Sequence, residues 1–143
     1  MTINGVQRPF LDAYLLFPTV SNQPFEVRLL VDTGADGTRL SPRDARRMEQ
    51  ELGIDIWNLP QGDPDTGIGG QAPTRVIPAI LLMDGFAALL ALHILEPQPG
   101  PPTALPSLLG RDVLSSFALF MEERTSRVLL LEPHEADALA LPH

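Results

Sequence analysis

The chain has 143 residues, a formal net charge of −8 and no cysteine. This length predicts a single domain over residues 1–143. The acidic balance argues against a protein that binds nucleic acid, because such a protein carries a basic patch. Without cysteine the chain has no disulfide and no thiolate metal site, and its three histidines are scattered along the sequence. We therefore expect neither a metal nor a cofactor.

Targeting and membrane segments are not expected either. The N-terminus lacks the basic region followed by an apolar core that is typical of a secretory signal. No apolar run is long enough to span a membrane, and the stretch 86–95 has the length of a buried strand. We expect a cytoplasmic protein that does not contact a membrane.

Fifteen prolines and eleven glycines divide the sequence into short segments, which favours many short strands over long helices. The first predicted strand covers residues 10–17, and a turn follows over 18–24. Residues 25–29 alternate between apolar and polar, which is typical of a half-buried strand. Residues 29–31 are all apolar, so this strand is expected to enter the core just before Asp32.

A helix is predicted from Ser41 to about Leu52. Ser41 can cap the N-terminus, and Pro42 suits the first helical position. Asp44 stands where the acid of a capping box belongs. Gly53 is expected to end the helix.

Two further strands, over residues 75–83 and 86–95, flank the dipeptide Asp84-Gly85. Asp-Gly between two apolar runs is a strong hairpin signal, because both turn positions need positive φ. The proline-rich segment 97–106 predicts a loop that is exposed or lines a cleft. The following segments are predicted to form a short helix and two closing strands: 112–117, 118–121 and 127–131.

The segment from Leu29 to Asp36 reads Leu-Leu-Val-Asp-Thr-Gly-Ala-Asp. An apolar strand that ends in a tight turn of small residues presents an acid at the floor of a cleft rather than on a solvated face. Peptide hydrolysis by aspartates needs two carboxyl groups: one takes a proton from water, and the other, protonated, donates to the carbonyl oxygen. Two such groups must be close enough to share a proton, so they titrate in separate steps.

The tripeptide occurs a second time as Asp65-Thr66-Gly67. Gly62-Asp63-Pro64 precedes this copy, so no buried strand leads to it. We interpret it as a surface turn that leads into a flap. Only about 30 residues separate the two copies, too few to build a lobe around each, so we do not expect a pair of aspartates within one chain.

Together with Leu108-Leu109-Gly110-Arg111, these segments resemble the retropepsins, the retroviral-type aspartic proteases, and their bacterial and cellular relatives. The similarity runs over about residues 7–131, and its motifs come in the order found in the family. The resemblance implies a mainly β fold, the closed β-barrel of the acid proteases, with one or two short helices and one lobe per chain. The acidic tail 132–143 is expected to be flexible.

The resemblance implies that Asp32, Thr33 and Gly34 form the catalytic signature. The Thr33 hydroxyl would lock the turn, and Gly34 would let the backbone approach the partner and the substrate. Because each chain supplies one Asp32, the implied enzyme is a homodimer that hydrolyses peptide bonds in a peptide or protein substrate. It needs no cofactor and no metal.

The resemblance also implies a substrate cleft and its support. By this resemblance Gly110 would pass beneath the catalytic loop, and Arg111 would form a partly buried ion pair with Asp36. Arg39 stands where viral relatives carry a small apolar pocket residue, so a purely hydrophobic side-chain preference is not expected. The residues implied to contact the substrate, including two from the flap tip, are Leu30, Ala35, Asp36, Ile68, Gly69, Pro106 and Leu108.

Other features differ from the viral enzymes. The terminal strands that weave the viral dimer together are not recognisable in this sequence, which implies a different or weaker dimer interface. A catalytically silent domain that binds peptides as a scaffold would keep the same fold, and it is the alternative function. A plain β-barrel whose turns match by chance would require three coincidences in the right order. The intact signature at Asp32 favours the enzyme.

Overall fold

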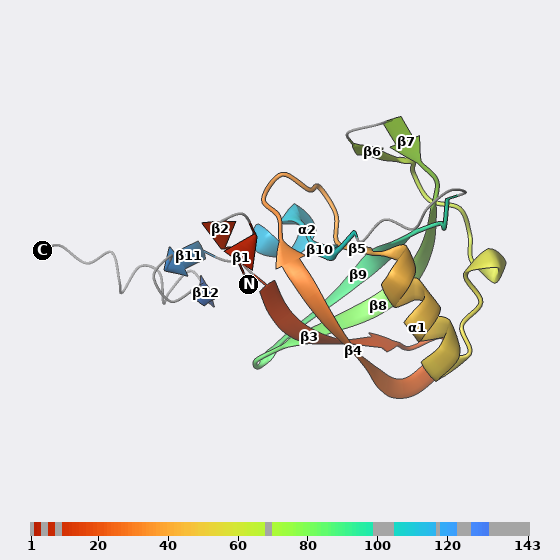
Figure 1. The fold of residues 1–143 in the computed structure, drawn as a ribbon. Coiled ribbons are helices and arrows are strands. Elements are labelled where there is room, and N and C mark those ends of the chain that lie inside the picture. The colour runs from red at the N-terminus through yellow and green to blue at the C-terminus, as the bar shows by residue number, and fades with distance from the viewer. Residues whose placement is uncertain are drawn as a thin grey trace, which may run out of the picture.

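A computed structural model describes residues 2–3, 6–7, 10–67, 70–98, 105–116, 118–122 and 127–131. The fold is mainly β and is built around a closed barrel of six strands in the order β10-β4-β3-β8-β9-β5 (Figure 1). The β10–β4 and β5–β9 pairs are parallel, and the other pairs are antiparallel. The barrel strands are β3 (Phe10–Phe17), β4 (Ser21–Val31), β5 (Arg39–Leu40), β8 (Thr74–Met83), β9 (Phe86–Leu95) and β10 (Ser107–Leu109).

The barrel interior is filled by alternate residues of its strands. Leu15 and Phe17 of β3 and Phe25, Val27 and Leu29 of β4 are all at most 1% exposed. Their neighbours along each strand point outward, because successive side chains alternate between the two faces. This periodicity agrees with the predicted strand over residues 10–17, whose bounds the structure confirms. The core holds the strand that leads to Asp32 in a fixed position.

The β8–β9 hairpin also forms as predicted. Asp84 and Gly85 both have positive φ, 35° and 84°, and Met83 pairs directly with Phe86. Such a two-residue turn matches the right-handed twist of the flanking strands. The hairpin provides two of the six barrel strands and one wall of the cleft described below.

The helix α1 (Pro42–Leu52) has the predicted bounds and packs against β4 and β9. The Asp44 N–H donates to the Ser41 Oγ at 3.2 Å. Gly53 is left-handed, with φ 71°, and its N–H donates to the Glu49 carbonyl at 2.8 Å. These contacts satisfy backbone groups at both ends of the helix.

The predicted capping box forms through a third residue. The Ser41 N–H donates to the Ser107 Oγ at 2.8 Å, and that hydroxyl donates to Asp44 Oδ2 at 2.6 Å. Ser107 thus stands between the capping acid and the N–H it would otherwise bind. All three residues are at most 3% exposed. The relay joins the start of α1 to β10.

The remaining elements lie outside the barrel. Figure 1 shows the β6–β7 hairpin projecting from it, at the top right of the view. Asp65-Thr66-Gly67 is strand β6 of this hairpin, so the prediction of a turn there was wrong. The short helix covers 111–114 rather than 112–117. The elements are η1 (Ile56–Asn58), β6 (Asp65–Gly67), β7 (Gly70–Ala72) and α2 (Arg111–Leu114).

Paired strands also occur near both ends of the chain. They form two antiparallel pairs, β1 (Thr2–Ile3) with β2 (Val6–Gln7), and β11 (Ala118–Glu122) with β12 (Arg127–Leu131). The second pair confirms two predicted strands, over 118–121 and 127–131, but they form a sheet of their own instead of closing the barrel. The tail 132–143, predicted to be flexible, lies outside the described residues. Of the helices in the described part of the chain, none has the length and hydropathy needed to cross a membrane.

Candidate active site

Asp32 follows the last residue of β4 and is fixed by backbone contacts on both sides. Its N–H donates to the Leu109 carbonyl at 3.0 Å, so β10 anchors the start of the turn. The Gly34 N–H donates to Asp32 Oδ1 at 2.9 Å, and the Ala35 N–H to the Asp32 carbonyl at 3.2 Å. The Asp32 residue is half-buried, and Thr33 and Gly34 are exposed. The turn therefore holds one carboxylate oxygen and leaves the group within reach of solvent.

The rest of the loop rests on the chain between β10 and α2. The Arg111 N–H donates to the Ala35 carbonyl at 2.8 Å, and the Asp112 N–H to the Asp36 carbonyl at 3.1 Å. A Cβ at Gly110 would lie 2.5 Å from the Gly37 carbonyl carbon and 2.9 Å from the Ala35 oxygen. These atoms are backbone and cannot rotate away, so only glycine fits where the two segments cross.

Thr38 and Asp112 make a second connection between these segments, which the sequence analysis did not identify. Thr38 is fully buried; its N–H donates to Asp112 Oδ2 at 3.1 Å and its Oγ1 to Asp112 Oδ1 at 2.8 Å. The Gly110 N–H donates to the Thr38 Oγ1 at 3.2 Å. One carboxylate thus satisfies two buried donors at the end of the loop that follows Asp32. The feature of the sequence that could have indicated this contact is the acid two positions after Gly110.

The predicted ion pair between Arg111 and Asp36 forms, but it is not partly buried. The two side chains are 59% and 89% exposed, because the loop carries them on the outer surface of this single chain. Exposed ion pairs contribute little to stability, since water screens them. In one chain the loop is therefore held mainly by the backbone contacts at Gly110 and by Asp112.

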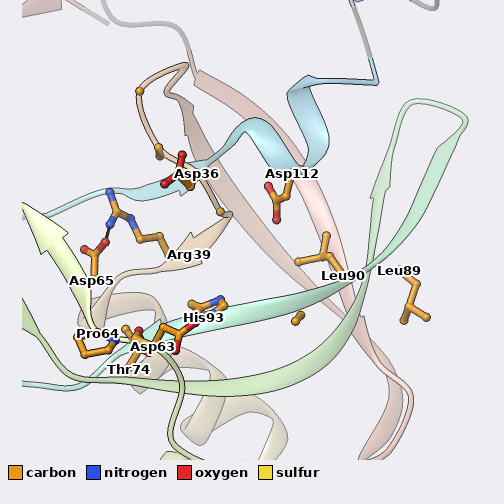
Figure 2. A pocket seen from close by; sticks show the side chains of 14 residues that line it. Asp36, Arg39, Asp63, Pro64, Asp65, Thr74, Leu89, Leu90, His93 and Asp112 are labelled. Atoms are coloured by element: carbon orange, nitrogen blue, oxygen red, sulfur yellow. Dashed lines mark hydrogen bonds and ion pairs between the residues drawn. The ribbon is translucent and has the colours of Figure 1, made fainter.

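A cleft of about 640 Å³ opens beside the turn (Figure 2). Its walls come from the loop that follows Asp32, from β9 and from the segment that leads into β6. Gly34, Ala35 and Asp36 line it, as do residues that sequence reasoning did not assign to the cleft, among them Asp63, Asp65 and His93. Asp32 and Thr33 lie in the same turn but do not line this cavity, nor do the half-buried Leu30, Pro106 and Leu108. Ile68 and Gly69 lie outside the described residues.

Five barrel strands contribute one residue each to a continuous row beside this cleft. In register across the sheet the row is Leu30, Leu108, Arg39, His93 and Val76. Directly paired residues point to the same face of a sheet, and all five are half-buried, whereas the core on the opposite face is fully buried. We call these five residues the outer row. Figure 2 shows Arg39 and His93 of this row beside the cavity.

The described residues bring no group of three His, Asp or Glu side chains together in a way that could hold a metal ion.

The sequence matches no family model, and it has no significant match among curated proteins. Solved structures do match. The EIAV protease complexed with the inhibitor HBY-793 is 23% identical, with a TM-score of 0.55, over 80% of this chain and 92% of that chain. A retropepsin-like aspartic protease from Rickettsia conorii is 21% identical, with a TM-score of 0.57, over 87% of this chain and 89% of that chain.

These two likenesses extend over most of each chain and establish the class of fold. The chain has the retropepsin-like fold: a mainly β closed barrel with two short helices. The fold predicted from the sequence is thereby confirmed.

Proposed function

We propose that this protein is a homodimeric aspartic endopeptidase, in which water held between two Asp32 carboxyls, one from each subunit, hydrolyses peptide bonds. One observation carries the proposal. In a retropepsin-like barrel, the Asp-Thr-Gly turn follows β4 and its Asp32 carboxylate accepts the Gly34 N–H at 2.9 Å while staying half-exposed. A carboxylate that is both oriented and reachable by water is what acid–base catalysis requires.

The need for a dimer follows from the number of acids. The second copy of the tripeptide offers no substitute, because Asp65 lies in β6 and forms an ion pair with Arg39. A two-fold symmetric dimer places identical residues face to face, so a single Asp32 per chain suffices. Asp36 and Arg111 are exposed in the same loop region as Asp32, and we propose that they lie on the surface that the partner subunit covers.

The reaction has two steps, addition of water and cleavage of the C–N bond. The ionised carboxyl takes a proton from water, the water oxygen bonds to the peptide carbonyl carbon, and the protonated carboxyl donates to the carbonyl oxygen. The tetrahedral intermediate then breaks its C–N bond: the carboxyl that took the proton from water donates it to the departing nitrogen, and the other carboxyl, now ionised, takes a proton from a hydroxyl of the intermediate. The products are one peptide with a new carboxyl end and one with a new amino end.

Other residues bind the peptide or support the site. An extended peptide lies between the catalytic turn and the flap hairpin, as an added strand. Gly110 lets the chain pass beneath the loop, and Arg111 pairs with Asp36. The residues proposed to contact the peptide are Leu30, Ala35, Asp36, Ile68, Gly69, Pro106 and Leu108.

The proposal is tested by incubating Asp32→Asn and the parent protein with a complex peptide mixture and sequencing the products. We expect the variant to lose activity by a factor on the order of 10² or more, because it has lost its acid and base. Asp84→Asn is the matched control, since Asp84 lies in the exposed hairpin turn. Circular dichroism confirms that each variant is folded. Cleavage by Asp32→Asn at the parent rate would contradict the proposal, and peptide binding without cleavage by the parent would favour a scaffold.

Dilution tests the dimer separately. A monomer holds half of a site, so specific activity should fall as the protein is diluted through the dimer dissociation constant. Sedimentation velocity at the same concentrations shows which species is present. Constant specific activity from a protein that sediments as a monomer would rule out the shared site.

A further inference from the structure

Arg39 is the one permanent charge in the outer row beside the cleft. It lies between Leu108 and His93 in register, and the other members, Leu30 and Val76, are aliphatic. Its side chain is 20% exposed and lines the same cavity as Gly34 of the catalytic turn and Ala35. A bound peptide that lies along this turn therefore sets a side chain against a guanidinium group.

Asp65 holds one end of that group. The Arg39 Nη1 forms an ion pair with Asp65 Oδ1, which joins barrel strand β5 to flap strand β6 (Figure 2). The Asp65 side chain is 25% exposed, so the pair is partly shielded from water. Because the guanidinium is planar and rigid, a contact at Nη1 fixes the direction of its other donors.

Asp65 accounts for one of the five N–H donors that a guanidinium carries. The Arg39 Nε is buried and makes no hydrogen bond within the described residues, and its burial closes it to a bound peptide as well as to water. The 20% of the side chain that is exposed therefore belongs to its other atoms, which line the cavity. A donor that is covered by an aliphatic peptide side chain loses its water and gains no acceptor, which is costly. An oxygen atom on the peptide side chain would accept a hydrogen bond from it.

We propose that Arg39, oriented by Asp65, is a specificity-determining residue, and that its subsite takes a peptide side chain that ends in a hydrogen-bond-accepting oxygen. This inference rests on the proposed peptidase function and deepens it. The fitting side chains are the carboxamides of Asn and Gln and the carboxylates of Asp and Glu. Asp36 and Asp63 also line the cavity, and their charges favour a carboxamide over a carboxylate. In a symmetric dimer the same subsite occurs on both sides of the cleaved bond.

The test is a cleavage profile on a complex peptide mixture for the parent protein and for Arg39→Leu and Arg39→Gln. The parent should enrich oxygen-ended side chains over aliphatic ones at one position on each side of the cut, on the order of tenfold. Arg39→Leu should reverse this preference toward aliphatic side chains. Arg39→Gln keeps a donor amide, so it should retain part of the preference. Arg46→Leu, which removes an exposed arginine of α1, is the matched control and should leave the profile unchanged.

A fourth variant separates charge from hydrogen bonding. Asp65→Asn removes a negative charge beside Arg39 while keeping the side-chain volume. It should raise the ratio of Glu to Gln at the same position, because a carboxylate then meets less repulsion. An unchanged ratio of Glu to Gln would show that Asp65 has no effect on this preference, and that part of the proposal would be wrong.

The outcomes distinguish this inference from the function on which it rests. If the parent prefers aliphatic side chains there, or if the Arg39→Leu profile equals that of the parent, the inference is wrong although cleavage still depends on Asp32. If no cleavage depends on Asp32, the proposed function fails, and the specificity proposal fails with it.

Discussion

Ser107→Ala is predicted to destabilise the protein more than any exposed serine substitution. Ser107 is 2% exposed; its Oγ accepts the Ser41 N–H at 2.8 Å and donates to Asp44 Oδ2 at 2.6 Å. The substitution removes a hydrogen bond to a charged acceptor, worth about 1.5–3 kcal/mol, and leaves a buried N–H unpaired, at about 1–3 kcal/mol. Arg47 still pairs with Asp44 at 3.0 Å and limits the loss. We expect the free energy of unfolding to fall by about 3 kcal/mol.

The assay is urea denaturation followed by circular dichroism, at one fixed protein concentration because dimerisation would shift the midpoint. A loss of about 3 kcal/mol corresponds to a decrease in Tm of about 10 °C for a domain of this size. Ser116→Ala, at an exposed serine, is the matched control. A double-mutant cycle with Asp44→Asn isolates the Ser107–Asp44 contact. A change below about 1 kcal/mol for Ser107→Ala would refute the reasoning from burial.

Three further predictions concern the loop that follows Asp32 and the proposed activity. Gly110→Ala places a Cβ 2.5 Å from the Gly37 carbonyl carbon. It should lower the free energy of unfolding in urea by about 2 kcal/mol or more, and it should also lower peptidase activity. Parent-like values of both would contradict the close crossing. Asp112→Ala should lower the free energy of unfolding, measured by thermal denaturation, by about 1–3 kcal/mol. Asp112→Asn should lower it by less, since the amide oxygen can still accept a hydrogen bond from one Thr38 donor. Activity should peak on the acid side of neutrality, because the reaction needs one of the two carboxyls protonated and the other ionised. A rate that stays flat from mildly acidic to alkaline pH would argue against a shared proton.

The elements that the sequence predicted well are those set by local chemistry. The strand at residues 10–17 follows from alternation, and the helix at Pro42–Leu52 follows from a capping serine, a proline and a terminal glycine. The Asp84-Gly85 turn needs two positive φ values, and this dipeptide supplies them. In each case the signal lies within a few residues of the feature, so no knowledge of distant contacts was needed.

The contacts that the sequence did not reveal are set by register between distant segments. The Ser107 relay depends on β10 lying parallel to β4, with Ser107 level with Leu29. The Thr38–Asp112 bonds depend on the crossing at Gly110. The exposure of the Asp36–Arg111 pair was predicted wrongly because exposure is a property of the folded surface, whereas the pairing itself follows from the order of the motifs.

The two copies of Asp-Thr-Gly show how context decides the role of a tripeptide. Asp32 comes after a strand whose preceding residues are held in the core, so its backbone has to turn at the barrel wall beside β10. The second copy follows a segment tied to the start of β8, where the Gly62 N–H donates to the Thr74 carbonyl at 3.0 Å, and it continues as a hairpin strand. Its aspartate then meets Arg39 across the cleft rather than a glycine N–H of its own turn. The same three residues thus present a solvent-reachable acid in one place and a fixed counter-ion in the other, and the difference comes from the strands that precede them.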